Sequence, residues 1–263
     1  MPDDKEPGFF VHGYGINNWD QYLSLFEAGR RHACRGEASA AYLAAPESPA
    51  WIQEKLGEIK IVVLLRNPVF RAYSLYCWMV MEGYESAPTF AAALEMENDR
   101  AASEEFRRRC PQYFADYLYF GTGLYADQVA RYLETFGTQH VQIHLFEDLV
   151  NRPQELYASV CRFLEIERRE IPSTAARNVS IIPRSIGLQN RLRLAQQRSR
   201  RVLHMAAWPV TRTCFALMKC NIALGRRERL DVTLQAQLTD RYRSDLARLA
   251  GLIGRDLNIW LKP

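Results

Sequence analysis

The strongest hydrophobic pattern in the chain is an aliphatic run at Ile59–Leu65, interrupted by a single lysine. A run of this length and composition is typical of a strand that is covered on both faces of a parallel sheet. It ends at Arg66–Pro68, because proline has no N–H to donate to a sheet ladder. The apolar spacing that follows predicts a helix over 69–81.

The alternation of helix and strand continues along the rest of the chain. Apolar spacing predicts a strand at 141–146. It predicts helices at 125–136, 155–164 and 233–252. The highly charged stretch 98–109 is predicted to be a solvated helix. This order indicates an α/β fold with a parallel sheet flanked by helices, and 263 residues suit a single domain over 1–263.

The composition is that of an ordinary globular protein. Of 263 residues, 48% are hydrophobic and 24% are charged, which excludes a disordered, collagen-like or coiled-coil chain. The N-terminal sequence MPDDKEPGFF carries acidic residues where a signal peptide has basic and apolar ones. No apolar stretch reaches the ~18 residues that a membrane span needs. We therefore expect a cytoplasmic protein.

The net charge of +4 is unevenly distributed. The segment 175–227 holds eleven basic residues and no acidic one, and it is predicted to be largely helical. Such a block is either a solvated face or a surface for an anion: ligand phosphates, an anionic membrane or a nucleic acid. Neither zinc-finger spacing nor an RNA-binding aromatic pattern occurs, so we expect no nucleic-acid partner. The apolar stretch Met205–Leu224 makes 191–224 a candidate for peripheral membrane contact.

Candidate chemistry follows directly after the best strand. Arg66 stands at its carboxyl end, and Ser74 comes eight residues later, near the start of the predicted helix. Ligands of open α/β sheets bind beyond the carboxyl ends of the strands, and helix amino termini favour anions. A guanidinium and a hydroxyl there form a plausible phosphate site. Taken alone, they could equally be a surface arginine and an incidental helix serine.

Several ordered motifs resemble those of one enzyme family. The segment IVVLLRNPVFRAYSLY is similar to the 3′-phosphate-binding segment of the sulfotransferases that use 3′-phosphoadenosine 5′-phosphosulfate (PAPS), in the branch that includes bacterial and heparan sulfate enzymes. Further segments are similar in order and spacing: Lys5–Phe10, Trp19, Tyr22, Gly36–Leu43, Gly123–Tyr125, Phe146–Leu149, Phe163–Leu164, Arg177–Ser180, Asp256–Leu257 and Trp260. The resemblance spans nearly the whole chain and implies a P-loop-like parallel sheet flanked by helices.

The resemblance implies transfer of a sulfuryl group from PAPS to a hydroxyl or amine of a glycan or small molecule, without a metal. The family's 3′-phosphate contacts fall on Arg66 and Ser74. Glu6 stands where glycan-modifying members keep the base that deprotonates the acceptor. A positioned carboxylate contributes about 10²- to 10⁴-fold to such a reaction. The residues of the acid-free block that we expect near the nucleotide are Arg177, Asn178, Ser180 and Arg184.

The sequence departs from the family in one major respect. The family opens with a strand and a Gly/Thr-rich loop that holds the 5′-phosphosulfate, and this sequence contains no such loop. We therefore expect the first strand and the phosphate loop to be missing, and the chain to be inactive or nearly so. Ala38 and Gly8 stand where several glycan-modifying members have lysine and histidine. Glu37 is either a second polar group in the cleft or an acid at a helix start.

Two alternatives compete with this function. Gly121–Ala126 fits the GxGxxA pattern of NAD-type dinucleotide-binding enzymes. The preceding residues 113–120 are nevertheless too aromatic and polar for a buried central strand. The other alternative is a module without turnover, which either binds adenosine 3′,5′-bisphosphate or docks on a membrane through 191–224.

Overall fold

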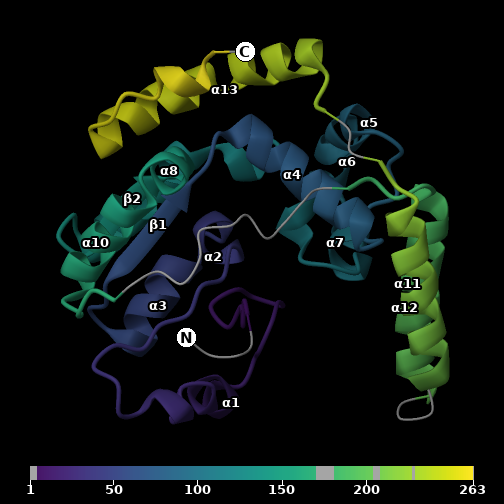
Figure 1. Cartoon of the computed structure of the whole chain (residues 1–263), viewed down its shortest axis with the longest axis horizontal. Coiled ribbons are helices and arrows are strands. Elements are labelled where there is room, and N and C mark those ends of the chain that lie inside the picture. The colour runs from purple at the N-terminus through teal and green to yellow at the C-terminus, as the bar shows by residue number, and fades with distance from the viewer. Residues whose placement is uncertain (1–4, 170–180, 204–207, 227–228, 263) are drawn as a thin grey trace. The chain divides into compact units, whose positions relative to one another are not determined.

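The computed structural model describes residues 5–169, 181–203, 208–226 and 229–262 (Figure 1). The chain divides into two compact units. The first comprises Met1–Asn67, Leu124–Ala175 and Tyr242–Lys262, and the second comprises Pro68–Gly123 and Ala176–Arg241. The prediction of a single domain stays a prediction, and each unit is described by itself.

The first unit contains the sheet. Its elements are α1 (Trp19–Ser24), η1 (Glu27–Gly29), α2 (Ala41–Ala44), α3 (Ser48–Leu56), β1 (Ile61–Leu65), α8 (Tyr125–Phe136), β2 (Val141–Leu145), α9 (Phe146–Asn151), α10 (Pro153–Leu164), the second part of α13 (Val232–Ile253) and η5 (Asn258–Trp260). β1 and β2 pair in parallel, with Ile61 opposite Val141 and Leu65 opposite Leu145. The predicted α/β fold with a parallel sheet is confirmed.

The prediction that β1 is covered on both faces is wrong. Val63 and Leu65 are buried, but Val62 and Leu64 are 42% and 46% exposed. Successive side chains of a strand point to opposite faces, so one face of β1 packs on the core while the other stays open. The aliphatic composition of the run predicts a strand correctly and its environment incorrectly.

Helix α8 packs its apolar side into the first unit. Val129 and Tyr132 are buried along it, and Gly137 ends it with a φ of 76°. The N–H groups of Tyr125 and Ala126 at its start are bound by the carboxylate of Asp245 from α13, at 2.8 and 3.3 Å. This long-range cap satisfies amides that no residue of α8 itself reaches.

The second unit is helical. Its elements are α4 (Pro68–Met81), α5 (Phe90–Glu95), α6 (Glu97–Ala102), α7 (Glu104–Arg109), η2 (Phe114–Tyr117), η3 (Gly121–Gly123), α11 (Ile186–Leu203), α12 (Trp208–Ala223) and the first part of α13. α11 and α12 lie side by side (Figure 1), so the acid-free block 175–227 contains two helices. The helices predicted at 69–81, 125–136, 155–164 and 233–252, and the strand at 141–146, are confirmed to within a few residues.

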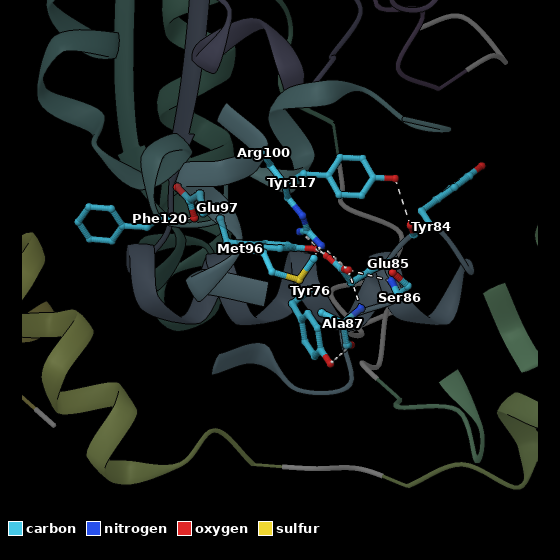
Figure 2. A network of polar contacts seen from close by, with 11 residues as sticks. Tyr76, Tyr84, Glu85, Ser86, Ala87, Met96, Glu97, Arg100, Tyr117 and Phe120 are labelled. Atoms are coloured by element: carbon cyan, nitrogen blue, oxygen red, sulfur yellow. Dashed lines mark hydrogen bonds and ion pairs between the residues drawn. The ribbon is translucent and has the colours of Figure 1, made fainter. Parts of the chain in front are cut away.

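A buried polar network organises this unit (Figure 2). The Glu85 carboxylate accepts hydrogen bonds from the Arg100 guanidinium, from the Tyr119 hydroxyl and from the N–H groups of Ser86 and Ala87. Nearby, the Glu97 carboxylate accepts from the N–H groups of Phe120 and Gly121.

The prediction of a solvated helix over 98–109 is confirmed for most of the stretch, whose residues are largely exposed, but the structure has two short helices in place of one. Ser103 separates α6 from α7 and accepts a hydrogen bond from the Phe106 N–H, which caps the second helix. Arg100 is only 4% exposed. Arg100 is the one residue of this stretch that is buried, because its partner, Glu85, comes from another segment.

Candidate active site

Glu6 lies in a loop that closes on itself. Glu6 and Gly8 both have left-handed backbone conformations, with φ of 56° and 65°. The N–H of Ile16 donates a 2.8 Å hydrogen bond to the Pro7 carbonyl, and a Cβ atom at Gly15 would lie 2.0 Å from that carbonyl oxygen. The loop therefore requires glycine at position 15 and holds Glu6 in a conformation that non-glycine residues seldom adopt.

The segment that precedes α2 holds this loop. The Gly8 N–H donates a 3.1 Å hydrogen bond to the Ser39 hydroxyl oxygen, and the Ala40 N–H donates to the Glu6 carboxylate. Glu6 is exposed as a whole residue, but partial burial of its carboxyl raises its pKa, and the Ala40 hydrogen bond opposes the rise. A carboxylate with a raised pKa is a stronger base.

Glu37 lies at the centre of a cluster of hydroxyl groups. Its carboxylate accepts hydrogen bonds from Tyr42 at 2.6 Å, from Ser39 at 3.0 Å and from Tyr22 at 3.4 Å. Burial raises the pKa of Glu37, the three hydroxyl groups lower it, and the negative charge of Glu6 raises it. Because α2 begins only at Ala41 and Glu37 bonds none of its amides, Glu37 is a polar group beside Glu6 rather than a helix-start acid.

Aromatic packing fixes the chain after Glu6. Phe9 and Phe10 are 4% and 1% exposed. Phe9 stacks on Tyr22 with ring centres 4.9 Å apart, and both phenylalanines contact Trp51. The Ser48 hydroxyl donates to the Phe10 carbonyl. The flexible-looking N-terminal segment is thus anchored in the core of the first unit.

Arg66 follows β1 and is half-buried. Its guanidinium lies over the Phe146 ring, 5.1 Å from the ring centre, and its carbonyl accepts a 3.0 Å hydrogen bond from the Tyr125 hydroxyl. Phe146 directly follows β2, so the parallel register brings these two residues to the same edge of the sheet. Stacking on an aromatic face is a preferred way to orient a guanidinium.

The acidic residues that follow β2 are engaged by basic and aromatic partners. Asp148 pairs with Arg255 through hydrogen bonds of 2.5 and 3.0 Å and also accepts from the Leu145 N–H. Glu147 accepts from the indole N–H of Trp260 at 2.9 Å. These contacts join the segment 146–149 to Arg255 and Trp260 near the C-terminus.

The remaining predicted donor residues belong to the second unit or lie outside the described residues. Ser74 is half-buried on α4. Arg184 is exposed ahead of α11, and its N–H donates to the Asn221 carbonyl. Arg177, Asn178 and Ser180 lie outside the described residues.

The dinucleotide pattern at Gly121–Ala126 has the wrong surroundings. A 3-10 helix, η2, precedes it where the fingerprint needs a strand. Glu97 binds the Gly121 N–H, and Asp245 binds the first amides of α8, which a pyrophosphate would have to reach. Carboxylates therefore occupy the positions of this pattern that would bind phosphate.

The described residues contain no group of three or more His, Cys, Asp or Glu side chains arranged to hold a metal ion. Across the same ranges, no helix has both the length and the apolar character needed to cross a membrane.

A model of the sulfotransferase domain matches residues 43–201, more than half of the chain. The chain belongs to the sulfotransferase family. It is similar to the bifunctional heparan sulfate N-deacetylase/N-sulfotransferase 1 of Caenorhabditis elegans, with 26% identity over 168 residues, which make up 61% of this chain and 18% of the relative. The chain thus spans less than a fifth of the length of that curated relative.

A solved structure of another sulfotransferase is similar to this chain. The crystal structure of a sulfotransferase from Alicyclobacillus acidocaldarius superposes with a TM-score of 0.72 and 26% identity, over 99% of this chain and 87% of that chain. The mixed, mostly helical α/β fold with a parallel sheet is therefore a sulfotransferase fold.

Proposed function

We propose that this sulfotransferase transfers a sulfuryl group from PAPS to a hydroxyl or amine of a glycan or small molecule. The observation that carries the proposal is the family match, to which the structure adds a carboxylate, Glu6, with a raised pKa in a tightly held loop. We also propose that the protein is cytoplasmic.

The reaction needs one base and a stabilised leaving group. The acceptor oxygen or nitrogen forms a bond to sulfur while the bond from sulfur to the bridging oxygen of the phosphosulfate breaks. Adenosine 3′,5′-bisphosphate leaves with that electron pair, and the acceptor proton passes to the Glu6 carboxylate. As in phosphoryl transfer, the protein contributes mainly alignment and charge stabilisation.

We assign the 3′-phosphate of the donor to Arg66 and Ser74 on the sequence resemblance. The stacking of Arg66 on Phe146 supports this role, because an oriented guanidinium binds phosphate through a forked pair of hydrogen bonds. Arg177, Asn178, Ser180 and Arg184 are proposed to approach the nucleotide from the acid-free block.

The acceptor is proposed to be a glycan amine or hydroxyl. Similarity to a heparan sulfate N-sulfotransferase supports an amine as the first acceptor to try. The alanine at position 38 and the glycine at position 8 remove two polar side chains found in several glycan-modifying members, so simple phenols and alcohols belong in the same panel.

The test is transfer from PAPS to an N-deacetylated heparan fragment and to small phenols, followed by mass spectrometry. The reaction is followed with enzyme in excess over donor, so that a single turnover is measured. Glu6→Gln should reduce the rate about 10²- to 10⁴-fold, while Glu47→Gln should not. Bisphosphate binding without any sulfated product would instead indicate a binding module, and selective NAD binding would contradict the proposal.

We also propose that α11 and α12 contact an anionic membrane surface. On α11, Leu188 and Leu194 are 46% and 37% exposed, and Arg191 and Arg198 are exposed on the same side of the helix. α12 adds Phe215, which is 50% exposed and lies beneath the Lys219 ammonium. Alternating exposed leucine and arginine in a segment without acidic residues suits the boundary between lipid headgroups and acyl chains.

A further inference from the structure

The Glu37 cluster reaches the Glu6 loop through two adjacent residues. The Ser39 hydroxyl has a single proton, which it donates to Glu37 at 3.0 Å. Its lone pairs remain available to accept from the Gly8 N–H at 3.1 Å. Ser39 is 8% exposed, so little water competes for these bonds. The next amide, of Ala40, donates to the Glu6 carboxylate.

The other oxygen of Glu37 is held by the two tyrosines. Tyr42 from α2 donates at 2.6 Å and Tyr22 from α1 at 3.4 Å. The hydroxyl of Tyr132 on α8 in turn donates to the Tyr42 carbonyl at 2.9 Å. Tyr22 stacks on Phe9, which lies within the Glu6 loop. Glu37 therefore ties α1, α2 and the Glu6 loop into one rigid arrangement.

The carboxylates of Glu37 and Glu6 differ in the number of hydrogen-bond donors that they have. Glu37 accepts from three hydroxyl groups, which stabilise its charged form, whereas a single amide lowers the pKa of Glu6. Burial and the negative charge of Glu6 oppose this stabilisation and raise the pKa of Glu37.

We infer that Glu37 is a positioning residue for Glu6: it orients Ser39, which holds the Gly8 N–H of the Glu6 loop, and with it the adjacent Ala40, whose N–H holds the base. This inference rests on the proposed role of Glu6. The other ionisable groups along the loop are Lys5, which neighbours Glu6 in sequence, and His12 with Glu47, whose carboxylate accepts the His12 N–H at 3.0 Å.

A matched pair of variants tests the inference. Glu37→Gln keeps the shape of the side chain and removes its charge. Glu47→Gln makes the same change at a residue that bonds the same loop but not Ser39 or Ala40. The titration of the Glu6 carboxyl carbon is followed by NMR, with Glu6→Gln to assign the signal, and single-turnover transfer is measured alongside.

In Glu37→Gln we expect the Glu6 titration to move to higher pH, because the Ala40 hydrogen bond that lowers the Glu6 pKa is weakened. The rate of the chemical step should fall about 10- to 100-fold, with little change in acceptor affinity. Glu47→Gln should change neither. If Glu37→Gln does not fold, Tyr42→Phe, which removes the 2.6 Å donor, should give a smaller change in the rate of the chemical step.

The outcomes separate this inference from the proposed function. Loss of transfer in Glu6→Gln together with a normal rate and an unmoved Glu6 titration in Glu37→Gln overturns the positioning role alone. Normal transfer in Glu6→Gln overturns the catalytic role of Glu6. If transfer is too slow to measure, an unmoved Glu6 titration in Glu37→Gln still overturns the inference.

Discussion

Arg100 donates hydrogen bonds to both carboxylate oxygens of Glu85, at 2.7 and 2.8 Å, and neither residue is more than 4% exposed (Figure 2). The guanidinium also lies against the rings of Phe106 and Tyr117. An ion pair so deeply buried ties the loop before α5 to α6. Removing one partner leaves an uncompensated charge in the interior of the second unit.

We therefore predict that Glu85→Gln lowers the free energy of unfolding by about 3–5 kcal/mol. Glu104→Gln removes half of an exposed pair with Arg107 and should cost less than about 1 kcal/mol. Urea denaturation followed by circular dichroism measures both. Equal losses in the two variants would mean that the buried pair adds nothing beyond a surface pair.

The Asp148–Arg255 pair predicts an acid-dependent loss of stability. Arg255 holds the pKa of Asp148 down to about 2, against an ordinary value of 3.8. A carboxyl with a lowered pKa stabilises the fold fully above its ordinary pKa, and this contribution disappears as the pH falls from about 4 towards 2. Because Arg255 is 36% exposed, we expect only about 1 kcal/mol.

Unfolding experiments between pH 5 and pH 2 test this prediction. Asp148→Asn should flatten this part of the pH profile, whereas Glu155→Gln, at an exposed acid near Arg152, should leave it unchanged. An Asp148→Asn profile as steep as that of the original protein would assign the acid sensitivity to other carboxyl groups.

Arg66 should control donor binding. Arg66→Ala removes a forked, charge-assisted contact to phosphate, so the affinity for adenosine 3′,5′-bisphosphate should fall about 10- to 100-fold in calorimetry. Arg66→Lys should recover part of it, because charge returns without the fork. Arg162→Ala, at an exposed arginine of α10, serves as the control. Unchanged binding in Arg66→Ala would refute the assignment.

The exposed face of α11 should bind vesicles that contain phosphatidylserine. Arg191→Gln and Arg198→Gln should each reduce cosedimentation about fivefold at low salt, and Leu194→Ser should reduce it further. Arg108→Gln, at an exposed arginine of α7, should have no effect. Equal binding to neutral phosphatidylcholine vesicles, or binding that salt does not weaken, would contradict an electrostatic membrane contact.

Local patterns were sufficient for the regular elements. The run before Arg66 and the apolar spacing of α8 predicted a strand and a helix because burial imposes periods of 2 and 3.6 on a sequence. A parallel sheet also followed from the order of elements. None of this required knowledge of distant contacts.

Contacts between residues far apart in the sequence explain where the structure differs from the local pattern. Arg100 belongs to a charged stretch that predicts a solvated helix, and the carboxylate that allows its burial, Glu85, lies fifteen residues earlier. The Asp245 cap of α8 comes from 119 to 120 residues away, beyond any capping pattern. In the candidate site, the hydroxyl groups of Ser39 and Tyr42 that bind Glu37 lie within five residues of it, so these hydrogen bonds are local in the sequence. Its link to Glu6 depends on how the loop folds back.

The open face of β1 has a practical consequence. In the part of the chain that the structure describes, β1 has a strand partner on one edge only, and Val62 and Leu64 expose aliphatic side chains on its open face. Aliphatic surface next to a free strand edge adheres to other chains. At high concentration the purified protein should therefore aggregate through this strand. Val62→Lys or Leu64→Lys should reduce that aggregation.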